Sequence, residues 1–426
     1  MYLKLISLIL ILLIMTSFAL QKPLKNTIKR TVIIGGGIHG ISTAYYLAQK
    51  GEKVLIIESE KIAAAASSKA GGFLAREWGS GPTISLHQQS FDLHEELAHH
   101  LNINSFRRIP TLSVSPSSSR KSNTNSNDAS WLDNSCRSQV MDGATAQVTP
   151  QEYCDKVFNA AVETGNVELL IGKCQGIEID DDVVEGVYVN VNTNTDDKDK
   201  EIEFYKGEKF VITAGPWSGH LAEDLFGCRL PMTGIKSTSV VYNNVPEAKD
   251  EPYALFCDED ANSCHLEIYP RNDASLYICG IGGSNYIDND MMREGGDCAA
   301  PSMIQANPSR VDAAQKSFAS MTTIGKRQKA DVVQACMRPC PPDAMPCMGK
   351  IPKTQNAYIS AGHNCWGILW APISGKAMSE LLIDGKSKCV DIEPFKPSRF
   401  GIVTPVESMR GSRGRHMGEK PVGEQW

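Results

Sequence analysis

The amino-acid sequence predicts an α/β fold with a mainly parallel sheet, together with a second, mostly antiparallel α+β domain. Short apolar runs alternate with amphipathic stretches from Thr31 onward, which is typical of βαβ units. A glycine-rich turn directly follows the first of these runs. Three later segments rich in β-forming residues are separated by Pro, Asn and Asp, which indicates an antiparallel sheet: residues 237–242, 266–269 and 276–281.

Length and composition limit the class of protein. A chain of 426 residues is long enough for two or three domains at about 150 residues per domain. The hydrophobic share of 42% and charged share of 22% are close to globular averages, which excludes a disordered, collagenous or multi-span membrane chain. The formal charge of −6 gives no general attraction to a polyanion, so we expect no nucleic-acid partner.

The first element is a strand that ends in a glycine-rich turn. Residues 31–34 form a short apolar strand, and a helix with Ile38, Ile41, Ala44 and Leu47 on one face follows the turn. The first glycine permits the tight turn, the third lets the backbone approach a pyrophosphate, and the last allows close packing of helix on strand. The turn and helix start are therefore predicted to bind a cofactor: Gly35, Gly36, Gly37, Ile38, His39 and Gly40. His39 is interpreted as a helix-start residue at a variable position of the motif, not as a ligand.

An acidic residue follows the second strand. Residues 54–57 form that strand, and Glu58 stands at its end, 18 residues after Gly40. A carboxylate there accepts hydrogen bonds from the ribose hydroxyls of a dinucleotide and repels a 2′-phosphate. The strand, turn, helix, second strand and acidic residue together predict a Rossmann-like dinucleotide-binding domain. The alternative, a glycine-rich turn that serves only for packing, does not account for the acidic residue.

Small residues and hydroxyls after the second strand indicate which dinucleotide binds. The stretch 66–74 (ASSKAGGFL) resembles the motif of the FAD-dependent D-amino acid oxidase family, most closely its glycine oxidase-like and sarcosine oxidase-like members. The resemblance implies FAD as cofactor and a Rossmann-like FAD-binding domain. It also implies that two serines contact the pyrophosphate and that the next residues line the flavin: Ser67, Ser68, Gly71, Gly72 and Phe73.

Three further segments resemble segments of the family and follow one another in the same order as in the family. The resemblance therefore extends from about residue 31 to about residue 400. Residues 210–217 (FVITAGPW) resemble the strand that ends against the cofactor, and Cys174 stands where the family has a strand residue facing the adenine. Residues 362–375 (GHNCWGILWAPISG) resemble the segment that wraps the flavin. These segments add Ala214, Gly215, Trp217, His363, Trp366, Gly367 and Ile368 to the implied cofactor-binding residues.

The same order predicts the domain boundaries. The Ser/Asn-rich stretch 115–130 and the polar stretch 192–201 are interpreted as solvated loops, and the Gly-, Arg- and Ser-rich end of the chain as a loosely attached tail. We expect a discontinuous FAD-binding domain at 31–110, 147–228 and 330–400, a substrate domain at 229–329, an insertion at 111–146 and a tail at 401–426.

The chemistry implied by the resemblance is hydride transfer to flavin, usually with O₂ as the final acceptor. The flavin carries that chemistry, and the protein must anchor a substrate carboxylate, for which a planar guanidinium is suited. Arg338, followed by Pro339, resembles the family arginine with this role and is the predicted catalytic residue. The alternative is an ordinary surface or inter-domain salt bridge.

Several other residues near the predicted site have two interpretations each. Cys336 resembles the cysteine that attaches FAD covalently in sarcosine oxidase-like relatives, although a buried, non-covalent thiol is favoured. His363 tunes the flavin or only packs against it. Tyr269, Arg271 and Lys236 lie on or near predicted strands, and ordinary exposure on a sheet is the default interpretation.

Thirteen cysteines are present, an odd number, and none forms a C-x-x-C pair. No Cys/His set has zinc-finger spacing, so we expect scattered structural thiols and no metal site.

Residues 1–30 are interpreted as a targeting segment. Lys4 precedes an apolar run over 5–15, and small residues at 16–19 form a cleavage region. The basic, acid-free stretch 21–30 resembles the second half of a bipartite plastid presequence of algae with complex plastids. We expect delivery to an organelle (a plastid) or the secretory pathway. The alternatives are a retained membrane anchor and a chain that starts farther downstream.

Three functions are compatible with these observations. The first is an FAD-dependent oxidoreductase that oxidises the C–N bond of a small amino acid or N-methylated amine, a small-molecule substrate. The second is an FAD-binding assembly or trafficking factor without turnover. The third, a monooxygenase-like flavoprotein, would need a nicotinamide site, and no second glycine-rich turn of this quality is present.

Overall fold

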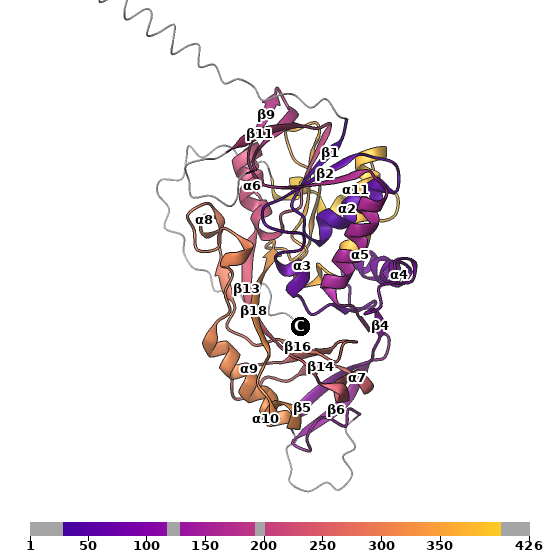
Figure 1. The fold of residues 1–426 in the computed structure, drawn as a ribbon, viewed down its shortest axis with the longest axis vertical. Helices are drawn as coiled ribbons and strands as arrows, with labels where there is room; N and C mark the ends of the chain where they lie inside the picture. Colours follow the sequence, from indigo (N-terminus) through magenta and orange to yellow (C-terminus); the bar gives the residue numbers. More distant parts are fainter. Residues whose placement is uncertain (1–28, 117–127, 192–200, 402–426) are drawn as a thin grey trace, which may run out of the picture.

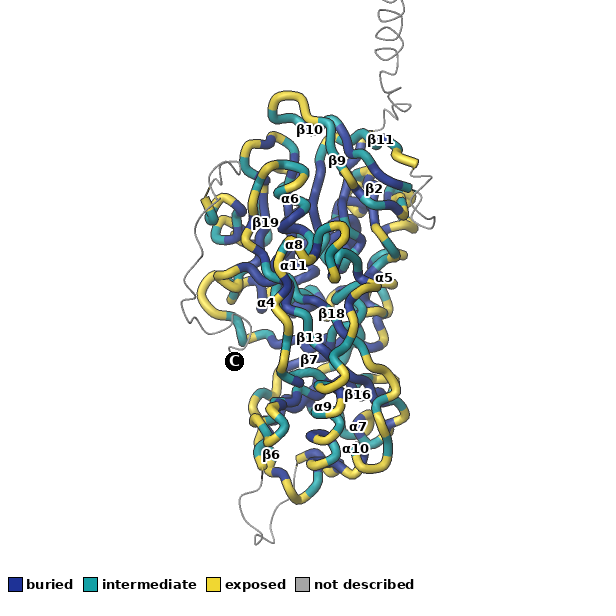
Figure 2. The backbone as a smooth tube through the Cα atoms, turned by 90° about the vertical axis from the view of Figure 1, so that its left-hand side faces the viewer, coloured by how far each residue is buried: buried dark blue, intermediate teal, exposed yellow. Residues whose placement is uncertain are grey.

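The computed structural model describes residues 29–116, 128–191 and 201–401. Its two main sheets lie at opposite ends of an elongated molecule, and two long strands, β13 (Thr233–Tyr242) and β18 (Val332–Cys340), run between the ends (Figure 1). Figure 2 shows that buried residues concentrate in the strands and inner helix faces of both ends. The predicted targeting segment up to residue 28, most of the two polar loops, and the tail from residue 402 lie outside the described residues.

The first sheet has six strands in the order β19-β20-β12-β1-β2-β8. All neighbouring pairs are parallel except β19 with β20. Its strands β1 and β2 are buried throughout, which explains their continuous apolar sequences. The bounds are β1 Thr31–Ile34, β2 Val54–Glu58, β8 Val167–Ile171, β12 Lys209–Ile212, β19 Cys347–Lys350 and β20 Ala357–Ala361.

Alternate residues of β1 pack into different layers. Ile33 belongs to the core under the helices, whereas Val32 and Ile34 pack toward a three-stranded sheet on the other face. Helix α2 follows β1 directly and lies close to α11, where a Cβ on Gly375 would come within 2.5 Å of the Ser42 backbone. The helices are α2 Ile38–Ala48, α4 Ile84–His100, α5 Pro150–Glu163, α6 Ser218–Phe226 and α11 Ala371–Asp384, and the small sheet contains β9 Lys173–Asp180, β10 Val183–Asn190 and β11 Ile202–Lys206.

The second sheet has eight strands and is antiparallel except where β14 pairs with β5. Its order is β17-β13-β16-β15-β14-β5-β6, with β18 paired along β13. Helix α9 packs one face, where Phe318 joins a core with Val240 and Ile278. The remaining bounds are β5 Thr111–Pro116, β6 Cys136–Asp142, β14 Ala254–Cys257, β15 Glu267–Pro270, β16 Leu276–Cys279, β17 Asn285–Ile287, α7 Pro246–Asp250, α8 Asn289–Met292, α9 Pro308–Met321 and α10 Thr323–Arg327.

Three short strands and one short helix connect the two ends. The strands form a small sheet in the order β3-β7-β4. Their bounds are β3 Phe73–Leu74, β4 Arg107–Arg108 and β7 Ala146–Gln147, and the helix is α3 Ala66–Lys69.

The structure confirms the predicted fold class and differs from the expected boundaries in two places. Residues 111–146 were expected to be an insertion, yet they supply β5 and β6 of the second sheet. Leu112 and Val114 of β5 are buried while Ser113 is exposed, a period of two that the neighbouring Ser/Asn-rich stretch obscures. The start of 330–400, assigned to the FAD-binding domain, is β18, whose hydrogen bonds go to β13 of the second sheet.

Among the described residues, no helix is both long and apolar enough to cross a membrane.

Candidate functional site

The ends of four parallel strands form one edge of the first sheet. β1, β2, β12 and β20 run the same way, so the segments that follow them meet at this edge. These segments begin at Gly35, Ser59, Thr213 and Gly362. The fold therefore brings together stretches that the sequence analysis identified separately.

Two glycines of the turn are required by close packing. Gly35 has φ +113°, and a Cβ there would lie 2.7 Å from the carbonyl carbon of Thr213. A Cβ on Gly40 would lie 2.1 Å from the Gly35 oxygen, so α2 could not start where it does with any larger residue.

Gly37 has a different environment, because a Cβ there would meet only the Ser67 hydroxyl at 3.2 Å and the Thr213 oxygen at 3.9 Å. It borders a large cavity. The Ile38 amide donates a hydrogen bond to Ser67 Oγ (2.9 Å), and the first turn of α2 contains no acidic residue. The positive end of the helix dipole is thus available to an anion at this cavity.

Glu58 is buried at the end of β2 and is held by the turn. One carboxylate oxygen accepts from the Gly36 amide (2.7 Å), and the other accepts from the Glu60 amide (2.9 Å) and the Ser59 hydroxyl (3.1 Å). Burial raises the pKa of Glu58, although these hydrogen bonds act in the opposite direction.

The cavity at this edge has a volume of about 950 Å³, large enough for a nucleotide. Residues 292–294 and 299–301 of the second domain also line it, and sequence reasoning did not identify them. Seven predicted cofactor-binding residues line this cavity: Gly35, Gly37, Glu58, Cys174, Ala214, Gly215 and Trp217.

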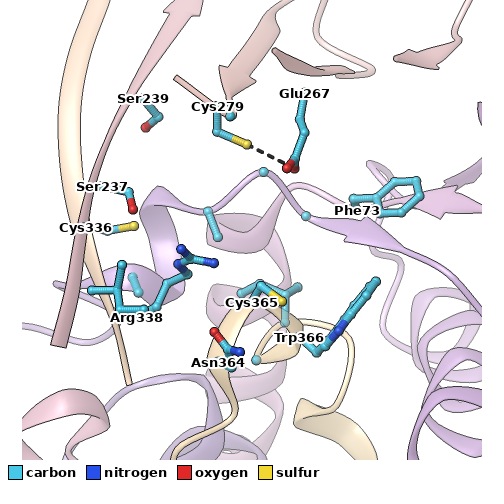
Figure 3. Close-up of a pocket in the computed structure, with 18 of the residues that line it drawn as sticks. Phe73, Ser237, Ser239, Glu267, Cys279, Cys336, Arg338, Asn364, Cys365 and Trp366 are labelled. Atoms are coloured by element: carbon cyan, nitrogen blue, oxygen red, sulfur yellow. Dashed lines mark hydrogen bonds between the residues drawn. The ribbon is translucent and has the colours of Figure 1, made fainter. Parts of the chain in front are cut away.

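A smaller cavity of about 230 Å³, part of whose lining is labelled in Figure 3, adjoins the first. Ala66 and Pro339 line both cavities. Of the predicted residues, Gly36, Gly40 and Ser68 line neither cavity, and Ser68 Oγ instead donates to the Ala65 oxygen (3.5 Å). The predicted residues that line the smaller cavity are Ile38, His39, Ser67, Gly71, Gly72, Phe73, Arg338, His363, Trp366, Gly367 and Ile368.

Aromatic side chains form one wall of the smaller cavity. Phe73 stacks on Tyr269 with ring centroids 5.2 Å apart, and Tyr269 stacks on Tyr277 at 6.2 Å. A Cβ on Gly71 would lie 2.3 Å from the Tyr269 ring, so the glycine lets the loop lie against this wall. Arg271 and Lys236 do not line the cavity; Arg271 lies over the Tyr277 ring and donates to the Ala70 oxygen (3.1 Å).

Two histidines, the half-buried His39 and the buried His363, form a further part of the lining. The rings of His39 and His363 stack with centroids 3.5 Å apart, and His363 Nε2 lies 3.1 Å from Ser374 Oγ. Burial lowers the pKa of His39 to about 3, and burial and the neighbouring ring lower the pKa of His363 well below its usual value. Both rings are therefore neutral at pH 7. His39 has a side-chain contact in the cavity that the sequence analysis did not expect.

Arg338 points into the smaller cavity from β18, where it is opposite Ile235 of β13 (Figure 3). Its Nε atom is buried without a hydrogen-bond partner. No carboxylate of the described chain lies within ion-pair distance of its guanidinium, so the salt-bridge alternative finds no partner there. The site therefore holds a half-buried cation that forms no ion pair with the protein, which suits an anionic ligand.

Several lining residues were not predicted. Glu267 and Cys279 come from adjacent strands of the second sheet, and Ser237 and Ser239 come from β13. The only signal for these residues in the sequence was that they lie in segments rich in β-forming residues. That signal does not show which face of a strand borders the site.

All thirteen cysteines are free thiols, and Cys336 and Cys365 line the smaller cavity. Burial raises the pKa of Cys336. No group of three His, Cys, Asp or Glu side chains among the described residues is arranged to hold a metal ion.

A nucleotide-sized cavity at the carboxyl ends of parallel strands, joined to a small cavity with an unpaired arginine, defines a dinucleotide-dependent oxidoreductase site. The sequence model of the family described as FAD dependent oxidoreductase (DAO) matches residues 30–381, so the chain belongs to this family. The predicted family and the predicted cofactor, FAD, are confirmed.

Individual relatives agree with this assignment. The chain is 27% identical to a putative oxidoreductase of Schizosaccharomyces pombe over 398 residues, covering 87% of this chain and 98% of the relative. It is 23% identical to human peroxisomal sarcosine oxidase over 417 residues, covering 90% and 98%.

Solved structures show the same fold. L-proline dehydrogenase from P. horikoshii superposes with a TM-score of 0.69 at 19% identity, covering 89% of this chain and 98% of that one. Glycine oxidase from Geobacillus kaustophilus superposes with a TM-score of 0.67 at 19% identity, covering 87% and 98%.

Proposed function

We propose that this FAD-dependent oxidoreductase oxidises the C–N bond of a small amino acid or N-methylated amine, with O₂ as the final acceptor. The observation that carries the proposal is Arg338, whose half-buried side chain forms no ion pair with a protein carboxylate, in the cavity next to the residues assigned to the flavin. The names of the relatives, among them sarcosine oxidase and glycine oxidase, support this class of substrate.

The described residues fit FAD. We assign Glu58 to the ribose, and the start of α2 with Ser67 to the pyrophosphate, because these residues line the two adjoining cavities. The flavin ring would lie against residues 71–73 and 363–368, which line the smaller cavity. Bound FAD supplies the acceptor for a hydride from the substrate carbon that carries nitrogen.

The role of the chain is to bind and orient the substrate. Arg338 holds the carboxylate through two parallel hydrogen bonds and fixes the reacting C–H bond in one direction. The cavity of about 230 Å³ favours small substrates. The stacked rings of Phe73 and Tyr269 give this cavity an aromatic wall.

We propose that FAD is held without a covalent bond. Burial raises the pKa of Cys336, which keeps this thiol protonated and weakly nucleophilic. Precipitation with acid should release all yellow flavin into the supernatant, and flavin that stays with the protein pellet would contradict this assignment.

Product analysis tests the reaction. With a substrate under air, each turnover should give one carbonyl product, one ammonia or amine, and one H₂O₂. A carbonyl product without H₂O₂ would contradict O₂ as acceptor but keep the C–N oxidation, and consumption of substrate without a carbonyl product would contradict the reaction itself.

The targeting role of residues 1–30 is likewise a proposal, supported by the apolar run and the basic stretch. A fluorescent protein fused behind residues 1–30 should enter an organelle or the secretory pathway, and fluorescence throughout the cytosol would contradict targeting.

A further inference from the structure

Two side chains of opposite charge line the smaller cavity from different strands. Glu267 comes from β15 and Arg338 from β18, and both point toward the centre of the cavity in Figure 3. They are not an ion pair, because no carboxylate of the described chain lies within ion-pair distance of Arg338. The two charged groups instead border the same cavity, which is open to a ligand.

Neutral groups hold the Glu267 carboxylate in place. Its Oε2 atom accepts a short hydrogen bond from the Tyr269 hydroxyl and a longer one from the Cys279 thiol (3.5 Å). Burial raises the pKa of both donors well above the usual values, so they stay protonated and donate. No Lys, Arg or His nitrogen of the described residues forms an ion pair with Glu267.

An unpaired charge in a partly buried site is unfavourable, and a ligand of opposite charge removes this cost. Here the cation and the anion form no ion pair with each other or with another described residue, and both line the same small cavity. A ligand with a carboxylate at one end and a cationic nitrogen at the other satisfies both charges at once. A plain carboxylic acid satisfies Arg338 only, and a plain amine satisfies Glu267 only.

We propose that Glu267 is a specificity-determining residue that binds the cationic nitrogen of a zwitterionic substrate whose carboxylate is bound by Arg338. The inference rests on the proposed function and narrows its substrate class to amino acids and N-alkylated amino acids. Hydroxy acids, N-acylated amino acids and simple amines bind weakly, because each lacks one of the two charges.

Binding of two unreactive ligands of equal shape tests this role without turnover. Trimethylglycine is a permanent zwitterion, and 3,3-dimethylbutanoate has the same shape with a neutral tert-butyl group. Binding is followed by the change in flavin absorbance of the FAD-loaded chain. The unaltered protein should bind trimethylglycine about 10-fold to 100-fold more tightly than its neutral analogue. Equal affinity would overturn the proposal, and this comparison needs no variant.

Two variants test whether Glu267 causes this preference. Glu267→Gln keeps the shape of the side chain and removes its charge. It should weaken the binding of trimethylglycine alone and so abolish the preference for this ligand over its neutral analogue. Glu259→Gln, at an exposed position outside the cavity, should keep the preference. A Glu267→Gln protein that loads FAD and retains the full preference would overturn the role of Glu267.

Arg338→Met separates this inference from the proposed function. This substitution should weaken the binding of both ligands, because both contain the carboxylate. If Arg338→Met leaves both affinities unchanged, the carboxylate anchor of the proposed function fails. If both ligands weaken but Glu267→Gln has no effect on the preference, only the role of Glu267 fails.

Discussion

The ring of His39 stacks on the ring of His363, with centroids 3.5 Å apart and an angle of 14° between the planes. One histidine comes from the glycine-rich turn and the other from the segment after β20, so the stack joins two parts of the site that are far apart in sequence. Both rings line the smaller cavity and both are neutral at pH 7. The lining contributed by this pair is therefore uncharged.

The two stacked histidines, whose ring nitrogens include buried atoms without a hydrogen-bond partner, predict a loss of stability in mild acid. The pKa of His39 is lowered to about 3 by burial, so the unfolded chain takes up a proton below about pH 6.5 that the folded chain does not. Stability therefore falls as the pH drops from 6.5 toward 3, and His39 alone accounts for about 2 kcal/mol between pH 7 and pH 5. In urea unfolding, the free energy of unfolding of His39→Asn should fall less between pH 7 and pH 5 than that of the unaltered chain. His99→Asn, at an exposed position on α4, should behave like the unaltered chain, and equal falls in all three proteins would contradict the prediction.

Gly37→Val should abolish flavin binding without unfolding the chain. A side chain here meets only the Ser67 hydroxyl and the Thr213 oxygen within 4 Å, so it extends into the space assigned to the pyrophosphate. We expect a colourless protein with unchanged circular dichroism. Gly143→Ala, where an added Cβ meets nothing within 4 Å, should stay yellow. A fully loaded Gly37→Val protein would contradict the nucleotide assignment.

Arg338→Met should raise KM for carboxylate substrates by about 100-fold or more while FAD stays bound, because removal of one partner of a buried charge pair costs about 3–5 kcal/mol. Arg338→Lys keeps the charge but loses the two parallel hydrogen bonds, so its KM should be intermediate. Steady-state kinetics and the flavin content of each protein provide the measurement. An unchanged KM in Arg338→Met would remove this residue as the anchor.

The second domain should contribute to the retention of FAD. Arg293 lines the larger cavity and donates to Glu223 Oε2 (2.7 Å) and to Asp224 Oδ1 (3.0 Å), both on α6 of the nucleotide-binding part. Arg293→Ala breaks this connection, so FAD should dissociate several-fold faster. In the unaltered protein dissociation should accelerate with salt, because these ion pairs are partly exposed. Equal dissociation rates at low salt, measured by flavin fluorescence, would contradict the role of Arg293.

The nucleotide part of the site could be predicted from the sequence because its signals are local. A strand, a glycine turn and a helix are adjacent in the chain, and Gly35, Gly37 and Glu58 all line the larger cavity. Glu267 could not be predicted as a site residue, because its position depends on which face of the second sheet packs against the first domain. The strands at 111–116 and 136–142 pair with each other, and the Ser/Asn-rich stretch between them obscured their pattern; the further pairing of 111–116 with β14 joins residues distant in the chain.

Flavin reduction without oxygen tests the central claim most directly. The FAD-loaded chain is mixed anaerobically with glycine, sarcosine, D-amino acids, L-proline and simple amines, and the blue absorbance band of oxidised flavin is followed. The account predicts that the band disappears with amino acids or N-methylated amino acids and persists with simple amines. A flavin that binds but stays oxidised with every compound would contradict a C–N oxidoreductase and favour a role of FAD in assembly or trafficking.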